Sequence, residues 1–170
     1  RWEPVHEALI AAVQQAGPDL LFMTGDLVTD RNRSLKTLER LTRCLGGPCP
    51  VLAVRGNWEV ACGPPLYRFR RLLAQMGVEL LVNESRLFTT PGGPVEVVGV
   101  DDLVCGRPDI EQALSARSAA AVLRVLLCHE PLGAMLLPPG HGVDLVLSGH
   151  THGAQIALPF PVSYTHLRAH

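Results

Sequence analysis

Two histidines separated by a single residue are the side chains of this sequence best placed to do chemistry. They lie in Gly149-His150-Thr151-His152-Gly153 and follow the short apolar run Asp144-Leu145-Val146-Leu147-Ser148. Residues i and i+2 that leave the end of a strand can carry both imidazoles to one rim, and flanking glycines allow loop dihedral angles that other residues resist. Two neutral imidazoles placed in this way can bind one cation, or one each of two. The competing interpretation is a pair of polar loop histidines.

Three other apolar runs also end in side chains that can bind metal ions. They begin at residues 22, 51 and 125 and lead into Gly25-Asp26, Gly56-Asn57 and Cys128-His129. Ligands of open α/β sheets gather at the carboxyl ends of the strands, so one shared site is the simplest explanation of these endings. The sequence therefore predicts one common rim for five side chains, namely Asp26, Asn57, His129, His150 and His152.

Hydrophobic spacing predicts the elements that must position these ligands. Apolar residues at helical spacing predict helices over residues 5–16, 35–45, 66–76 and 110–116. Continuous apolar runs predict parallel strands over residues 20–24 and 51–54, and further strands over residues 122–128 and 144–148. Shorter spacing around the turn Pro91-Gly92-Gly93-Pro94 predicts antiparallel hairpin strands over residues 78–82, 87–89 and 95–100.

The order of these blocks resembles that of the calcineurin-like metallophosphoesterases. Motifs of that family run Asp-x-His, Gly-Asp, Gly-Asn-His-Asp/Glu, a single His and Gly-His-x-His, and the last four blocks occur here in order between residues 25 and 155. The resemblance implies an α/β fold of two stacked mixed β-sheets flanked by helices, an αββα sandwich. The strand that carries Asp-x-His is missing, so we interpret the sequence as truncated at its N-terminus and expect this fragment by itself to be inactive or nearly so.

The same resemblance implies roles for the ligands. Asp26 would bridge two divalent ions, Asn57, His129 and His150 would complete the shell of one ion, and His152 would join the other. A mixed oxygen and nitrogen shell suits Mn, Fe or Zn better than Ca. Asp26, Asn57 and His129 form the expected catalytic set, and the implied reaction is hydrolysis of phosphate esters or anhydrides by metal-activated water.

Three further residues are candidates for substrate contact. Trp58 stands where the commonest family pattern has histidine, and an indole donates a hydrogen bond but transfers no proton at neutral pH. Substrates with an acidic leaving group, such as a pyrophosphate or an aryl diester, are therefore expected. Arg55 could contact a phosphate or simply be solvated at a strand end, and Asp101 could face the site or cap a turn.

The sequence also predicts roles for residues adjacent to the candidate ligands. The resemblance implies that Glu59 orients its neighbours without binding metal. Glu130 could hold the imidazole of His129 from behind, and Cys128 is expected to be a small packing residue.

Composition indicates one globular domain over residues 1–161. Of the 170 residues, 47% are hydrophobic and 18% are charged, and the formal net charge of −1 offers no long-range attraction for nucleic acid. Five cysteines without a Cys-x-x-Cys spacing suggest a reducing compartment. Residues 162–170 resemble a translated sequencing adapter, and we interpret them as a scar that contributes no ligands.

The expected substrate is a phosphorylated small molecule or a nucleotide-linked lipid. The Gly-His-Thr-His-Gly-Ala-Gln ending resembles a bacterial branch with membrane-associated phosphodiesterases and lipid-precursor diphosphatases. A cytoplasmic location or a peripheral association with the membrane is expected, and a missing N-terminus could carry a signal or an anchor. A non-catalytic scaffold of the same fold and a metal-dependent nuclease are the alternatives.

Overall fold

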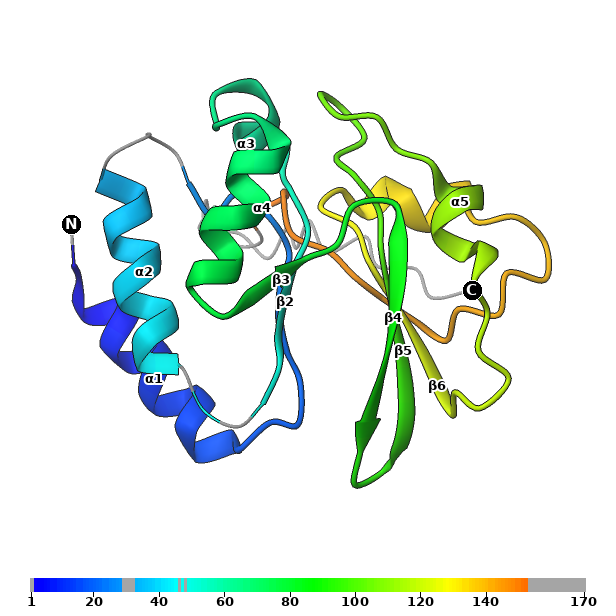
Figure 1. The fold of residues 1–170 in the computed structure, drawn as a ribbon, viewed down its shortest axis with the longest axis horizontal. Helices are drawn as coiled ribbons and strands as arrows, with labels where there is room; N and C mark the ends of the chain where they lie inside the picture. Colours follow the sequence, from blue (N-terminus) through cyan, green and yellow to red (C-terminus); the bar gives the residue numbers. More distant parts are fainter. Residues whose placement is uncertain (1, 29–32, 46, 48, 153–170) are drawn as a thin grey trace, which may run out of the picture.

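Two β-sheets stacked face to face form the centre of the molecule (Figure 1). The structure, a computed structural model, describes residues 2–28, 33–45, 47 and 49–152. The first sheet has the order β1-β2-β3 and both of its pairings are parallel. In the second sheet, of order β4-β5-β6-β7, β4 and β5 are antiparallel and the other pairings are parallel. The strands are β1 (Leu21–Met23), β2 (Val51–Ala53), β3 (Val78–Leu80), β4 (Glu84–Thr90), β5 (Gly93–Gly99), β6 (Leu123–Leu127) and β7 (Leu145–Leu147).

Helices cover the outer faces of both sheets, which confirms the predicted α/β architecture. In Figure 1, helices α1, α2 and α4 lie on the side of the first sheet, and α5 lies on the side of the second. The mixed pairing expected for both sheets is found in the second, whereas the described strands of the first are all parallel. The helical segments are α1 (Pro4–Ala16), α2 (Arg33–Leu45), α3 (Asn57–Ala61), α4 (Leu66–Gln75), α5 (Ile110–Ser115) and the 3-10 helix η1 (Pro131–Leu136).

The side chains of β2 alternate between two hydrophobic clusters, one on each face of the first sheet. Val51 and Ala53 pack toward the helices in a cluster that includes Phe69 of α4. Leu52 of β2 and Val97 of β5 belong to the cluster between the two sheets. Because successive side chains of a strand point to opposite faces, a strand covered on both sides reads as a continuous apolar run. A third cluster joins the outer face of the second sheet to α5 and to Leu137, which follows η1.

The segment over residues 78–82 corrects the prediction of a hairpin. Residues 78–80 form β3, which pairs in parallel with β2, and only β4 and β5 form the antiparallel hairpin. The chain returns from β2 through α3 and α4, and a helical crossover of this kind delivers the next strand parallel to the previous one. Helix α3, which begins at the candidate ligand Asn57, was not predicted.

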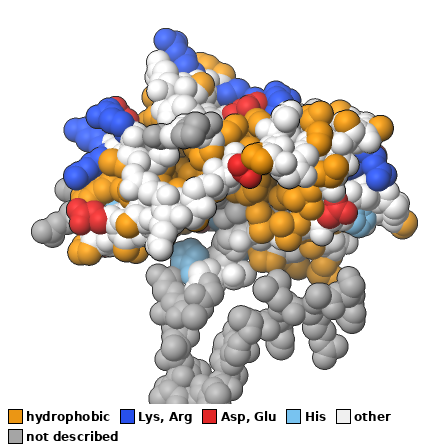
Figure 2. Space-filling model, turned by 90° about the horizontal axis from the view of Figure 1, so that it is seen from below, with side chains coloured by type: hydrophobic (Ala, Val, Ile, Leu, Met, Phe, Trp, Pro, Cys, Tyr) orange, Lys and Arg blue, Asp and Glu red, His pale blue; other side chains and the backbone are white. Residues whose placement is uncertain are grey.

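Helix α1 differs from expectation in its burial. None of its residues is buried, and Val5 and Leu9 are 64% and 46% exposed. Between α1, α2 and β1 lies a cavity of about 600 Å³ whose lining includes Met23 and Leu38, with Asp26 as the only candidate ligand among its lining residues. Hydrophobic side chains also reach the surface on the face seen in Figure 2. Within the described residues, no helix is both long and apolar enough to span a membrane.

Candidate metal centre

Three of the predicted ligands meet at the carboxyl ends of β1, β6 and β7. Asp26 Oδ2 lies 3.3 Å from His129 Nε2, and His150 Nδ1 lies 3.2 Å from the same His129 nitrogen. Donor atoms that share one ion at bond lengths of about 2.0–2.2 Å are themselves roughly 3.0–3.5 Å apart. Asp26, His129 and His150 therefore stand at separations that suit one common divalent ion.

The orientation of His129 is set by a backbone group of the first sheet. Its Nδ1 lies 2.6 Å from the carbonyl oxygen of Thr24, just after β1. A carbonyl oxygen only accepts, so Nδ1 carries the proton and the lone pair of Nε2 faces Asp26 and His150. The expectation that Glu130 holds this imidazole is corrected, because Nδ1 is held by Thr24, whereas Glu130 Oε2 accepts a hydrogen bond from the backbone N–H of Leu103.

A backbone group of α3 orients the carboxylate of Asp26. Its carboxylate Oδ1 accepts a hydrogen bond of 3.1 Å from the backbone N–H of Trp58, which leaves Oδ2 turned toward His129. Asp26, His150 and His152 have φ angles of 54°, 62° and 47°, in the left-handed region that residues with a Cβ rarely adopt. Such strain clusters at functional sites, where the surrounding contacts hold it.

Glu59 connects the two loops that carry Asp26 and Asn57. Its buried carboxylate accepts hydrogen bonds from the backbone N–H groups of Asp26 and Val28, both at 2.8 Å, and of Gly56 at 2.7 Å. Burial raises the pKa of Glu59 above its usual value of 4.5 by more than these hydrogen bonds lower it. Glu59 thus orients backbone groups around the site, in the manner that the sequence implied.

Asn57 presents an acceptor that suits a metal ligand. Its Oδ1 is buried and has no hydrogen-bond partner among the residues that the structure describes. A buried carbonyl oxygen left unpaired costs about 1–3 kcal/mol, which coordination of a cation would offset. Close packing surrounds this corner, since a Cβ at Gly25 (φ 94°) would lie 2.6 Å from His129 Nδ1 and 2.7 Å from the nitrogen of Gly56.

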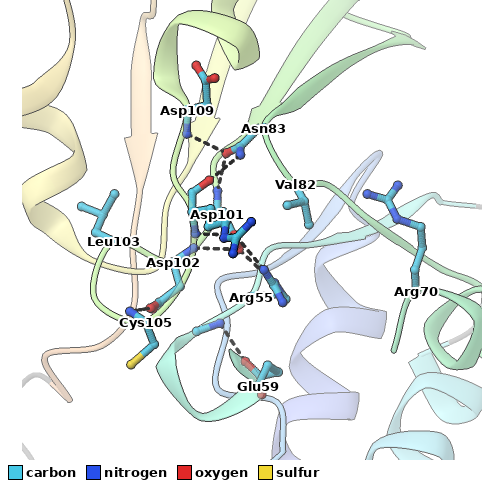
Figure 3. Close-up of polar contacts among 12 residues, drawn as sticks. Arg55, Glu59, Arg70, Val82, Asn83, Asp101, Asp102, Leu103, Cys105 and Asp109 are labelled. Atoms are coloured by element: carbon cyan, nitrogen blue, oxygen red, sulfur yellow. Dashed lines mark hydrogen bonds and ion pairs between the residues drawn. The ribbon is translucent and has the colours of Figure 1, made fainter. Parts of the chain in front are cut away.

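The remaining candidate residues lie outside the group formed by Asp26, His129 and His150. His152 is exposed and lies outside the compact group formed by Asp26, His129 and His150. The indole of Trp58 is 44% exposed. The expectation of simple solvation for Arg55 is wrong, because its guanidinium is buried and donates to both carboxylate oxygens of Asp101, at 2.9 and 2.6 Å (Figure 3). Substrate contact by Arg55, Trp58 or Asp101 stays a prediction.

A pair of buried carboxyl groups beside His129 was not foreseen. Asp102 Oδ2 and Glu130 Oε1 are both buried and lack an N–H or O–H partner within the described chain, and one proton shared between them would satisfy both. Burial, followed by Asp102, raises the pKa of Glu130 to about 7. Burial opposes ionisation of Asp102 as well, but Glu130 and the N–H groups of Cys105 and Val104 lower its pKa below the usual value.

Comparison with known proteins shows the family to which this chain belongs. A family model described as calcineurin-like phosphoesterase matches residues 3–154. The chain belongs to this family, and the prediction made from the motifs is confirmed.

Curated relatives come from several bacteria. The uncharacterized metallophosphoesterase YkuE of Bacillus subtilis is 34% identical over 157 residues, which cover 91% of this chain and 54% of that protein. YkoQ of the same organism is 33% identical, over 84% of this chain and 53% of that protein. The phosphodiesterase YaeI of Escherichia coli is 28% identical, over 91% of this chain and 56% of that protein. The chain thus spans about half the length of these relatives.

Proposed function

We propose that the protein hydrolyses phosphodiesters or phosphoanhydrides at a centre of two divalent ions. The observation that carries the proposal is the convergence of Asp26, His129 and His150. The buried amide oxygen of Asn57, which has no hydrogen-bond partner among the described residues, supports it. Four side chains from four separate strand ends would supply one carboxylate oxygen, one amide oxygen and two imidazole nitrogens. This donor set suits Mn, Fe or Zn.

Two of the ligands have a support that fixes the atom available to a metal ion. His129 would bind through Nε2 because its Nδ1 proton is held by Thr24, and Asp26 would bind through Oδ2 because Trp58 N–H occupies Oδ1. A second lone pair on the Asp26 carboxylate and the imidazole of His152 are the groups proposed for a second ion. Bound ions would neutralise phosphate charge and lower the pKa of water.

Trp58 favours a substrate whose leaving group needs no proton. Its backbone N–H orients Asp26, and its indole is exposed. Trp58 directly follows the candidate ligand Asn57 in the sequence. An indole transfers no proton at neutral pH, so an aryl phosphodiester or a pyrophosphate would be cleaved in preference to an alkyl phosphomonoester. In the cell, the substrate would be a phosphorylated small molecule or a nucleotide-linked lipid. The name phosphodiesterase given to YaeI supports the diester class.

The test is an assay of a version that carries the Asp-x-His motif at its N-terminus, with the present chain assayed in parallel, using Mn²⁺ and bis(p-nitrophenyl) phosphate beside a simple alkyl phosphomonoester and a DNA duplex. We expect turnover of the aryl diester that is lost on chelation and restored by Mn²⁺. Metal binding without turnover of any phosphoester would instead support the non-catalytic scaffold. Preferential cleavage of DNA would support the nuclease.

A further inference from the structure

The candidate ligands come from two different sheets. Asp26 and Asn57 follow β1 and β2 of the first sheet, whereas His129 and His150 follow β6 and β7 of the second. The sheets pack through apolar side chains such as Leu52. Apolar packing is not directional, so it does not by itself fix how far apart the strand ends lie.

One buried ion pair joins the two sheets near these strand ends. Arg55 follows β2 and lies two residues before Asn57, and Asp101 follows β5 of the second sheet. The guanidinium donates through Nε and Nη2 to the two carboxylate oxygens, and the residues are 9% and 2% exposed. A two-point contact of this kind fixes the angle as well as the distance between the partners.

Asp101 is itself held rigidly, as Figure 3 shows. Its carboxylate also accepts hydrogen bonds from the backbone N–H groups of Asp102 at 3.0 Å and Arg107 at 2.9 Å. Its backbone N–H donates to Asn83 Oδ1 at 3.0 Å. The side chain of Asp101 therefore cannot swing to follow Arg55 without breaking two further hydrogen bonds, and its backbone is held by a third.

The network continues from Asp101 to the metal ligand of the second sheet. Asp102 lies next to Asp101, and its carboxylate lies within 4.8 Å of that of Glu130, the residue that follows His129. Glu130 Oε2 accepts a hydrogen bond of 3.0 Å from the backbone N–H of Leu103. A continuous polar connection thus runs from the loop of Asn57 to the end of the strand that delivers His129.

We propose that the Arg55–Asp101 ion pair is a positioning device that sets the separation between the two halves of the metal centre. The proposal rests on the metal centre of the proposed function. In this role Arg55 acts through Asn57 and its loop, and not by contact with substrate. A change that keeps the charge but removes the two-point geometry should lower the affinity for metal ions while the protein stays folded.

A second buried ion pair offers a matched control. Arg124 Nε lies 3.0 Å from Glu96 Oε2, and the side chains are 5% and 2% exposed. The two residues are register partners on β6 and β5, so this pair lies within one sheet and joins no two halves of the centre. Arg124→Lys therefore removes a comparable guanidinium contact without changing the spacing between the sheets.

The experiment measures Mn²⁺ binding by equilibrium dialysis and the midpoint of thermal unfolding for wild type, Arg55→Lys and Arg124→Lys. Changes in residues that orient a ligand typically cost about 10–100-fold in metal affinity, and we expect a loss of this size for Arg55→Lys. Arg124→Lys should lower the midpoint by as much or more while Mn²⁺ affinity stays within about twofold of wild type. Equal Mn²⁺ affinity of wild type and Arg55→Lys would overturn the proposal, even if KM rose, because that result assigns Arg55 to substrate contact.

A second variant covers the case in which Arg55→Lys does not fold. Arg55→Met combined with Asp101→Asn removes both charges together, so no ion is left buried alone. We expect this double variant to fold and to bind Mn²⁺ more weakly than wild type. Failure of both variants to fold, with Arg124→Lys folded, would make the pair a folding requirement and overturn the positioning role. Absence of Mn²⁺ binding by the wild type would contradict the proposed function itself.

Discussion

The Nδ1 atom of His129 lies 2.6 Å from the carbonyl oxygen of Thr24, although 105 positions separate the two residues in the chain. This contact joins the end of β6 in one sheet to the end of β1 in the other. It also fixes the tautomer, because the proton on Nδ1 leaves Nε2 free to bind a cation. The metal-binding atom of His129 is therefore determined by a backbone group of the opposite sheet.

Removal of His129 should abolish tight metal binding. We expect His129→Ala to lose at least about 100-fold in Mn²⁺ affinity, since even residues that only orient a ligand contribute up to that amount. Hydrolysis of an aryl phosphodiester should fall in parallel. His141 is the matched control because it lies in the loop before β7, where its ring accepts a hydrogen bond from Val143 N–H. An equal loss of Mn²⁺ affinity in His141→Ala would contradict the assignment.

Replacement of Glu59 by glutamine should destabilise the fold despite the similar shape. Three backbone N–H groups point at the two carboxylate oxygens, and the amide nitrogen of glutamine cannot accept a hydrogen bond from any of them. A buried donor left unpaired costs about 1–3 kcal/mol, so the free energy of unfolding should fall by about that amount. Urea denaturation measures this difference.

Glu79→Gln serves as the comparison for that measurement. Glu79 forms an exposed ion pair with Arg86, in which the side chains are 43% and 45% exposed. Exposed pairs contribute about 0–1 kcal/mol, so this variant should unfold at nearly the wild-type urea concentration. If Glu59→Gln were no less stable than Glu79→Gln, the three hydrogen bonds would not hold the site together.

Introduction of a proton donor at position 58 should broaden the substrate range. In Trp58→His, hydrolysis of esters with poor leaving groups should rise more than hydrolysis of aryl diesters. General acid assistance contributes about 10²–10⁴-fold, and only where the leaving group needs a proton. The ratio of kcat/KM for the two substrate types is the measurement. An equal change for both types would remove the basis for a preference for acidic leaving groups.

The cysteines should differ sharply in reactivity. Cys128 is fully buried, and burial followed by the negative charge of Glu130 raises the pKa of its thiol to about 12. At pH 8 its thiolate is scarce, so iodoacetamide should alkylate Cys128 only after the protein unfolds. Cys44 and Cys105 are exposed and should react in the native protein. Mass spectrometry of peptides after timed labelling checks this order, and native labelling of Cys128 at the rate of Cys105 would contradict it.

Local patterns in the sequence are enough to predict which strand end carries each ligand. An apolar run that ends in Asp, Asn or His is a local pattern, and the carboxyl ends of strands in α/β proteins face a common edge. The positions of Asp26, His129 and His150 could therefore be predicted, together with most of the helices and strands. The final glycine, alanine and glutamine of the His150 motif and the segment 162–170 lie outside the described residues.

The groups that hold those ligands could not be predicted, because they come from distant parts of the folded chain. Distant segments meet in three places around the site. They bring the Thr24 carbonyl to His129, three backbone N–H groups to the carboxylate of Glu59, and Asp102 to Glu130. The place of β3 beside β2 was also missed, because its apolar run fits a hairpin strand and a parallel strand equally well. Sequence patterns record the period and burial of one segment, whereas hydrogen bonds between sheets depend on how two segments are packed against each other.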